Sequence, residues 1–130
     1  MSAKTKIAEN EGNFNEDSGE LAKFIAKTLS NRKAEEIATL DLQGITTLAD
    51  YFVICNGLSE VHAKALSEEV EEKVRENFGE KPWRREGLEA RRWIILDYVN
   101  IVVHIFKKEA REHYAIEKMW GDAKTEYYKD

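Results

Sequence analysis

Two stretches of the chain carry apolar residues at the spacing of a helix. The first follows Asp17 and Glu20, whose spacing is that of a capping box, and it places Leu21, Phe24, Ile25, Thr28 and Leu29 on one face. The second begins at Ser59, which can cap a helix, and Gly79 can end it in the left-handed conformation. Its apolar face carries Leu66, Val70, Val74 and Phe78. The sequence therefore predicts two amphipathic helices.

Four shorter apolar runs predict strands. Residues 37–42 and 51–55 form the first two runs, and each is closed by a glycine-containing turn. Residues 92–98 and 101–106 flank Val99-Asn100 and predict a β-hairpin. Both hairpin runs are apolar on nearly every residue, so we expect the sheet to be covered on both faces. A last helix is predicted from Lys108 to about Trp120.

The hairpin has a definite register if Val99-Asn100 is a two-residue turn. Ile94 then faces Ile105, and Leu96 faces Val103. One face carries Ile94, Leu96, Tyr98, Ile101, Val103 and Ile105, and the other carries Trp93, Ile95, Asp97, Val102, His104 and Phe106. The first face is the stronger candidate for the core, because the second mixes large rings with two polar groups. We expect the second face to be only partly covered.

The order of elements, α-β-β-α-β-β-α, predicts a single α/β domain in which a mixed β-sheet is flanked by helices. Residues 1–16 are polar and aperiodic and are predicted to be disordered. The domain is expected to span 17–122. Residues 123–130 are predicted to form a charged C-terminal tail.

Composition narrows the classes of function. The 130 residues carry a net charge of −5, so an acidic domain of this kind favours a basic protein partner over naked nucleic acid. Cys55 is the single cysteine, which excludes an internal disulfide framework. The N-terminal stretch has no apolar region and many acids, unlike a signal or transit peptide, and no run is long enough to span a bilayer. A cytoplasmic location is expected.

Candidate chemistry in the chain is sparse. Asp97 and His104 are diagonal neighbours on the mixed hairpin face, where they can form an acid-base pair or a structural hydrogen bond. No nucleophile or phosphate loop accompanies them. The three histidines lack the spacing of a helical metal pair, so no metal and no cofactor is expected. Arginines at 84, 85, 91 and 92 surround Trp83 and form a small basic patch that can touch RNA phosphates.

Four segments resemble the ribosomal silencing factor (Iojap, RsfS) family. They are ADYFVICNGLSE at 49–60, REGLE at 85–89, RWIILDYVNIVVHIF at 92–106 and EAREHYAIEKMW at 109–120. The resemblance spans about residues 18–122. It implies a nucleotidyltransferase-like fold without the catalytic residues. The Gly57-Leu58-Ser59 turn is similar to the Gly-Ser turn of those transferases, but the carboxylate pair that would hold Mg²⁺ is missing.

The resemblance also implies a function and a site. Family members bind ribosomal protein L-fourteen on the large ribosomal subunit and block its joining to the small subunit, which represses translation. The partner-contacting tryptophan of the family corresponds to Trp93. With Phe106 it would form an apolar anchor, Asp97 and Glu86 would meet basic groups on the partner, and Tyr98 would lie at the rim. The expected protein is a binding module, with no catalytic residue.

Two other functions remain open from the sequence. One is a nucleotidyltransferase-like enzyme that uses Asp97 and His104. The other is a self-associating domain, in which the Trp93 face pairs two copies as a homodimer when no ribosome is present.

The turn of the hairpin departs from the family pattern. The family usually has Gly-Asp there, which suits positive φ, whereas Val99-Asn100 places a β-branched residue in the turn. A wider or bulged turn would shift the register by one residue. Such a shift would move Trp93 to the other face of the sheet.

Overall fold

The computed structural model describes residues 14–129, with side chains from residue 18 onward. The helices are α2 (Phe14–Asn31), α3 (Glu60–Phe78), α4 (Lys108–Tyr114) and α5 (Ile116–Met119). The strands are β1 (Glu35–Asp41), β2 (Tyr51–Gly57), β3 (Arg84–Glu86), β4 (Trp93–Asp97), β5 (Ile101–Lys107) and β6 (Lys124–Tyr127). No helix in this part of the chain is long and apolar enough to cross a membrane.

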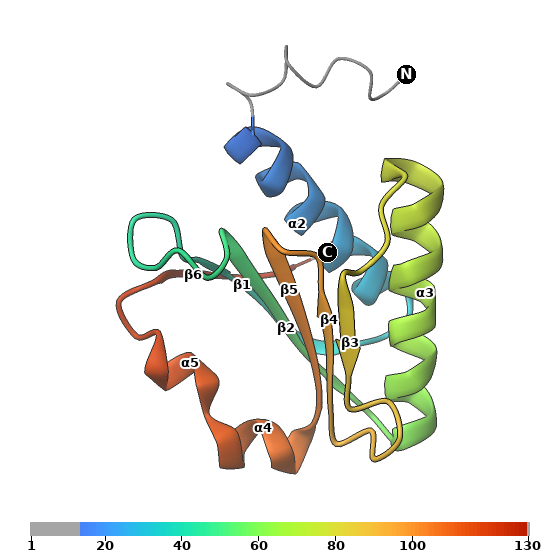
Figure 1. Cartoon of the computed structure of the whole chain (residues 1–130). Coiled ribbons are helices and arrows are strands. Elements are labelled where there is room, and N and C mark those ends of the chain that lie inside the picture. Colours follow the sequence, from blue (N-terminus) through green and yellow to red (C-terminus); the bar gives the residue numbers. More distant parts are fainter. Residues whose placement is uncertain (1–13, 130) are drawn as a thin grey trace.

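The strands form one mixed sheet in the order β3-β4-β5-β2-β1-β6. Strands β2 and β5 pair in parallel, and all other neighbours are antiparallel. Helices α2 and α3 cover one face, and α4 and α5 lie on the other (Figure 1). The predicted α/β domain with a mixed sheet flanked by helices is confirmed.

Each face of the sheet has its own apolar core. On the α2–α3 side, Ile25 and Leu29 of α2 and Leu66 of α3 are fully buried against the sheet. Phe24 and Phe78 join the two helices at the rim, with ring centroids 5.1 Å apart. On the α4–α5 side the core is built around Phe52 and Phe106. The predicted helix faces are therefore the buried ones, because their spacing puts every third or fourth side chain toward the sheet.

The two caps of α3 were also predicted correctly. The Ser59 side chain accepts a hydrogen bond from the His62 amide at 3.0 Å, which satisfies one of the unpaired amides of the first turn. Gly79 ends the helix with a φ of 69°, and its amide donates to the Arg75 carbonyl. Ser59 is thus the N-cap of α3, as the sequence predicted, and this role accounts for the Gly57-Leu58-Ser59 turn without transferase chemistry.

The hairpin keeps the predicted register in spite of its valine. Ile94 pairs with Ile105 and Leu96 with Val103, so Trp93 stays on the mixed face. Val99 takes a φ of 74°, and the Asn100 amide donates to the Tyr98 carbonyl at 2.9 Å, which closes a γ-turn. This conformation is strained for a β-branched residue. A carboxylate oxygen of Asp97 accepts the Val99 amide at 2.8 Å and helps to hold the turn.

Four predictions about the ends and connections need correction. Helix α2 begins at Phe14, so Asp17 lies inside it, and residues 14–16 are helical rather than disordered. Residues 1–13 lie outside the described residues. The predicted tail contains β6, which pairs with β1 and extends the domain past residue 122. Residues Arg84–Glu86, for which no strand was predicted, form β3, and the predicted last helix is split by Ala115, whose φ is 48°.

Candidate partner-binding surface around Trp93

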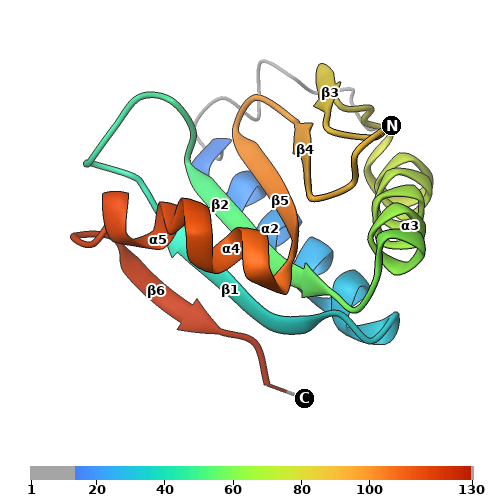
Figure 2. The ribbon, with the colours of Figure 1, turned by 90° about the horizontal axis from the view of Figure 1, so that it is seen from below.

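The α4–α5 face of the sheet is covered over only part of its width. Helix α4 lies against β5 and β2, whereas β3 and β4 extend beyond α4 and α5 (Figure 2). In the antiparallel pairing, Arg84 and Glu86 of β3 lie opposite Asp97 and Ile95 of β4. Together with Trp93 they form what we call the open surface: Arg84, Glu86, Trp93, Ile95 and Asp97. All five side chains are partly or largely exposed.

Trp93 is held in one orientation by three contacts. Its indole N–H donates a hydrogen bond to Nδ1 of His104 at 3.0 Å. Its ring stacks on Phe106, with centroids 5.0 Å apart and planes inclined by 26°, and it also meets Tyr114 at 4.6 Å. One side of the indole is therefore fixed in the protein while the residue remains partly exposed. A tryptophan fixed in this way loses little side-chain entropy when it contacts a partner.

His104 lies beneath this surface and is 5% exposed. Its ring packs edge to face against Phe52, with centroids 4.5 Å apart. Burial lowers the pKa of the His104 imidazole to about 3, so the ring is neutral at physiological pH. Because Nδ1 accepts the indole hydrogen bond, the proton is assigned to Nε2. His104 therefore acts as a fixed acceptor that orients Trp93.

Asp97 and His104 do not form the acid-base pair that the sequence left open. The Asp97 carboxylate accepts the Val99 amide and lies 3.6 Å from the Arg84 guanidinium. His104 instead pairs with Trp93. A neutral, buried imidazole and a carboxylate engaged elsewhere are poorly placed for proton transfer to a substrate.

The low pKa of His104 predicts a specific dependence of stability on pH. In the unfolded chain a histidine titrates near 6.5, so between about pH 6.5 and pH 3 the unfolded state binds one proton more than the folded state. The stabilisation is complete above about pH 6.5 and falls by about 1.4 kcal/mol for each pH unit below it. Urea unfolding at pH 7, 6 and 5 measures this slope. His104→Gln should lose less stability per pH unit than the wild type, and equal slopes would contradict the assignment.

The acidic groups of the open surface share one cation. The Arg84 guanidinium lies 3.2 Å from Glu86 and 3.6 Å from Asp97. Arg85, on the other face of β3, forms a bidentate pair with Glu71 of α3. The predicted basic patch around Trp83 is thus divided between two faces and partly neutralised by acids, which weakens the case for an RNA contact. Trp83 itself is 71% exposed.

Two of the predicted contact residues lie elsewhere. Phe106 is fully buried beneath Trp93, so it supports the indole from below and presents no surface to a partner. Tyr98 is on the opposite face of the sheet, 5% exposed, in the core with α2 and α3. Burial raises the pKa of its phenol. Neither residue can contact a partner in this conformation, and both predictions are revised.

Comparison with known proteins identifies the family of this chain. The family model described as "Ribosomal silencing factor during starvation" matches residues 15–130. The chain belongs to the ribosomal silencing factor family. The ribosomal silencing factor RsfS of Halalkalibacterium halodurans is 40% identical over 106 residues, which cover 82% of this chain and 90% of that protein. The Bacillus subtilis RsfS is 39% identical over 103 residues, covering 79% and 86%.

A solved structure agrees with this assignment. A protein from Chromobacterium violaceum has a crystal structure that superposes with a TM-score of 0.76 at 29% identity, over 86% of this chain and 92% of its own. The family model and the relatives therefore agree that the chain is a ribosomal silencing factor family member, which is a regulatory class of protein. The open surface is its candidate binding site.

The Glu86-Gly87 pair, which is part of the family-like segment 85–89, has a structural reason at Gly87. The residue follows β3 with a φ of 81°, and a Cβ at this position would lie 1.9 Å from the carbonyl oxygen of Trp93. Only glycine lets the loop cross the backbone of Trp93 so closely. The Glu86-Gly87 pair therefore brings Glu86 and Arg84 next to the open surface.

Sequence reasoning missed two aromatic side chains on the α4–α5 face of the sheet, one of which touches Trp93. Tyr114 of α4 is 47% exposed and touches the Trp93 ring, and Trp120, after α5, is partly exposed and meets Phe52 at 6.0 Å. Both lie in the family-like segment 109–120, but helical spacing alone did not reveal that the helix bends at Ala115. They extend the apolar surface from Trp93 toward α5.

Arg111 holds the bent helix pair in place. Its guanidinium forms a bidentate bond with Glu117 of α5, at 3.1 and 2.8 Å, and also donates to the Glu36 carbonyl and to the amide oxygen of Asn56. The Arg111 residue is 7% exposed. One buried side chain thus joins α4 and α5 to β1 and β2.

Proposed function

We propose that the chain represses translation by binding ribosomal protein L-fourteen on the large ribosomal subunit and sterically blocking the small subunit. The observation that carries the proposal is Trp93, a partly exposed and firmly oriented indole on the uncovered part of the sheet in a ribosomal silencing factor family member. Tryptophan is among the residues most enriched at binding hot spots. On this proposal the protein acts in the cytoplasm, where subunits join.

The surroundings of Trp93 suit a basic partner. Ile95 and Tyr114 extend the apolar contact on either side. In the described part of the chain, Arg84 is the cation that pairs with both Asp97 and Glu86, so a lysine or arginine of the partner can compete for these carboxylates. The net charge of −5 favours the approach of a basic ribosomal protein. The proposed mechanism is occlusion and involves no chemical step.

Sedimentation with ribosomal particles tests occlusion directly. We expect the chain to sediment with isolated large subunits at about one copy per particle and to be absent from pellets of assembled ribosomes. Adding it to separated subunits should reduce their joining. Equal binding to isolated and assembled large subunits would contradict the proposal, because an occluding factor needs a surface that the small subunit covers.

Self-association is the second candidate use of the same surface. It is favoured by the partly exposed apolar residues Trp93, Ile95 and Tyr114, which a second copy could cover. Light scattering of the isolated chain, with and without ribosomal protein L-fourteen, separates the two uses. If ribosomal protein L-fourteen dissociates a homodimer, the contact between copies and the contact with the partner use the same surface.

A further inference from the structure

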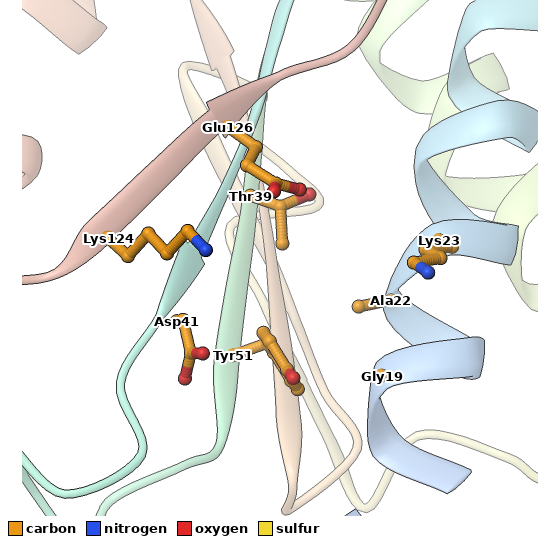
Figure 3. A pocket seen from close by; sticks show the side chains of 8 residues that line it. All are labelled: Gly19, Ala22, Lys23, Thr39, Asp41, Tyr51, Lys124 and Glu126. Carbon is orange, nitrogen blue, oxygen red and sulfur yellow. The ribbon is translucent and has the colours of Figure 1, made fainter. Parts of the chain in front are cut away.

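A second hollow lies on the far side of the sheet from Trp93, between α2 and the edge formed by β1 and β6. Its volume is about 240 Å³. The lining comes from four elements and comprises Gly19, Ala22, Lys23, Thr39, Asp41, Tyr51, Lys124 and Glu126 (Figure 3). The α2 wall presents Gly19 and Ala22, and the Tyr51 hydroxyl lies 3.4 Å from the position that a Cβ at Gly19 would take. Neither the family assignment nor the proposed function uses this hollow.

Charges of both signs face the hollow without pairing with one another. Lys23 comes from α2, Asp41 from β1, and Lys124 and Glu126 from β6. Among the described residues, no ion pair within 4.0 Å joins any two of these four side chains. In Figure 3 the amine of Lys124 and the carboxylate of Asp41 reach into the hollow from the sheet side. One carboxylate oxygen of Asp41 accepts the Gln43 amide at 3.0 Å, so the second oxygen of Asp41 and the amine of Lys124 remain available to a ligand.

Two hydroxyl groups add neutral hydrogen-bonding capacity. Thr39 and Tyr51 line the wall between the charged side chains. The pKa of the Tyr51 phenol is raised by partial burial and by the nearby carboxylates of Asp41, Asp50 and Glu126. The phenol therefore keeps its proton at neutral pH and can donate a hydrogen bond to a carboxylate.

The balance of charges selects the class of ligand. Two carboxylates in the lining oppose a nucleotide or another multivalent anion, and two lysines oppose a metal cation. The volume is below the roughly 300 Å³ at which pockets for drug-sized ligands begin, so a single small molecule fits. A molecule with one positive and one negative group satisfies both halves of the lining at once.

We propose that this hollow binds a small zwitterion of the α-amino acid class. The ligand carboxylate would lie toward Lys23 and Lys124, with the hydroxyls of Thr39 and Tyr51 as further donors. The ligand ammonium group would lie toward Asp41 and Glu126.

Titration of the full chain with individual L-amino acids, followed by amide chemical shifts in NMR spectra, tests the proposal. We expect saturable shifts that cluster at residues 19–23, 39–41 and 124–126 for at least one amino acid. Blocking either charge of that ligand, as the N-acetyl derivative or as the carboxamide, should raise Kd at least tenfold. This comparison needs no variant and so does not depend on whether a mutant folds.

Variants supply the matching test on the protein side. Asp41→Asn and Lys124→Met should each raise Kd at least tenfold, while Lys81→Met, which removes an exposed lysine outside the hollow, should leave Kd unchanged. The proposal would be overturned if no amino acid, at millimolar concentration and a 20-fold molar excess over the protein, produced saturable shifts. Equal affinity for the blocked derivatives, or tighter binding of phosphate or a dicarboxylate than of any amino acid, would also overturn it.

Discussion

Replacing Trp93 with alanine should weaken binding to isolated large subunits by about 100-fold or more, which corresponds to roughly 2.7 kcal/mol. The substitution removes the one large aromatic ring of the open surface that is both partly exposed and oriented from below by His104 and Phe106. Affinity is measured by co-sedimentation with large subunits and by pull-down of ribosomal protein L-fourteen. The far-ultraviolet circular dichroism spectrum should stay that of the folded protein, since the ring lies at the edge of its core.

Trp83→Ala provides the matched control. It is the same chemical change at a tryptophan that is 71% exposed and lies outside the open surface. Its ring touches only the edge of that surface, where the Arg84 guanidinium lies 5.4 Å from the ring centroid. We expect its affinity to stay within about twofold of the wild type, because residues at the rim of an interface contribute little to binding. Normal capture of ribosomal protein L-fourteen by Trp93→Ala would show that the interface has been placed on the wrong surface. Equal losses of affinity in Trp93→Ala and Trp83→Ala would also show that the interface has been misplaced.

Trp93→Phe separates the ring from its hydrogen bond. Phenylalanine keeps the stacking on Phe106 but has no N–H to donate to His104. If the bond to His104 orients the anchor, this variant should bind more weakly than the wild type and more strongly than Trp93→Ala. Wild-type affinity in Trp93→Phe would restrict the role of His104 to stability.

Arg111→Met should lower the free energy of unfolding by about 2–4 kcal/mol. The substitution leaves the Glu117 carboxylate without its cation and the Glu36 carbonyl and the Asn56 amide oxygen without the donor they share. The Glu117 side chain is itself 29% exposed, so most of the loss comes from the two acceptors at the buried end of Arg111, which no longer receive a hydrogen bond. Urea unfolding at pH 7 measures the loss.

The chain contains its own control for this effect. Arg85 forms the same bidentate geometry with Glu71, but its side chain is 48% exposed. In the described part of the chain, the Arg85 guanidinium donates to the Glu71 carboxylate and to no buried acceptor, so Arg85→Met should cost no more than about 1 kcal/mol. Similar losses for Arg85→Met and Arg111→Met would contradict the argument that burial sets the difference. The double variant Arg111→Met with Glu117→Gln should lose less than the sum of its single changes.

The sequence predicted those parts of the fold in which side-chain periodicity and burial coincide. The alternation in β4 and β5 was enough to assign Ile94 and Leu96 to the core face, and the turn kept that register although Val99 is strained. Strands β3 and β6 were missed because their residues are polar and exposed, so they are strands only through pairing with a neighbour. No local signal marks such strands.

The site was predictable to a similar degree. Alternation along a strand tells which face a side chain occupies, but it does not tell how deeply the residue lies. Trp93 was correctly placed on the partly covered face, while Phe106, on the same face, proved fully buried. The position of Tyr114 next to Trp93 depends on the bend at Ala115. There a non-glycine residue adopts a left-handed conformation, which no sequence pattern predicted.

The strand β6 has a consequence for the behaviour of the chain in concentrated solution. It pairs with β1 through residues 38–41, and without it the backbone groups of that edge would be open to strands of other molecules. Lys124 and Glu126 place charges on β6, which makes it a poor template for further strand addition. Strand β6 thus protects the β1 edge from pairing with strands of other molecules. A chain that ended before Lys124 would leave that edge unpaired, and we expect it to aggregate more readily.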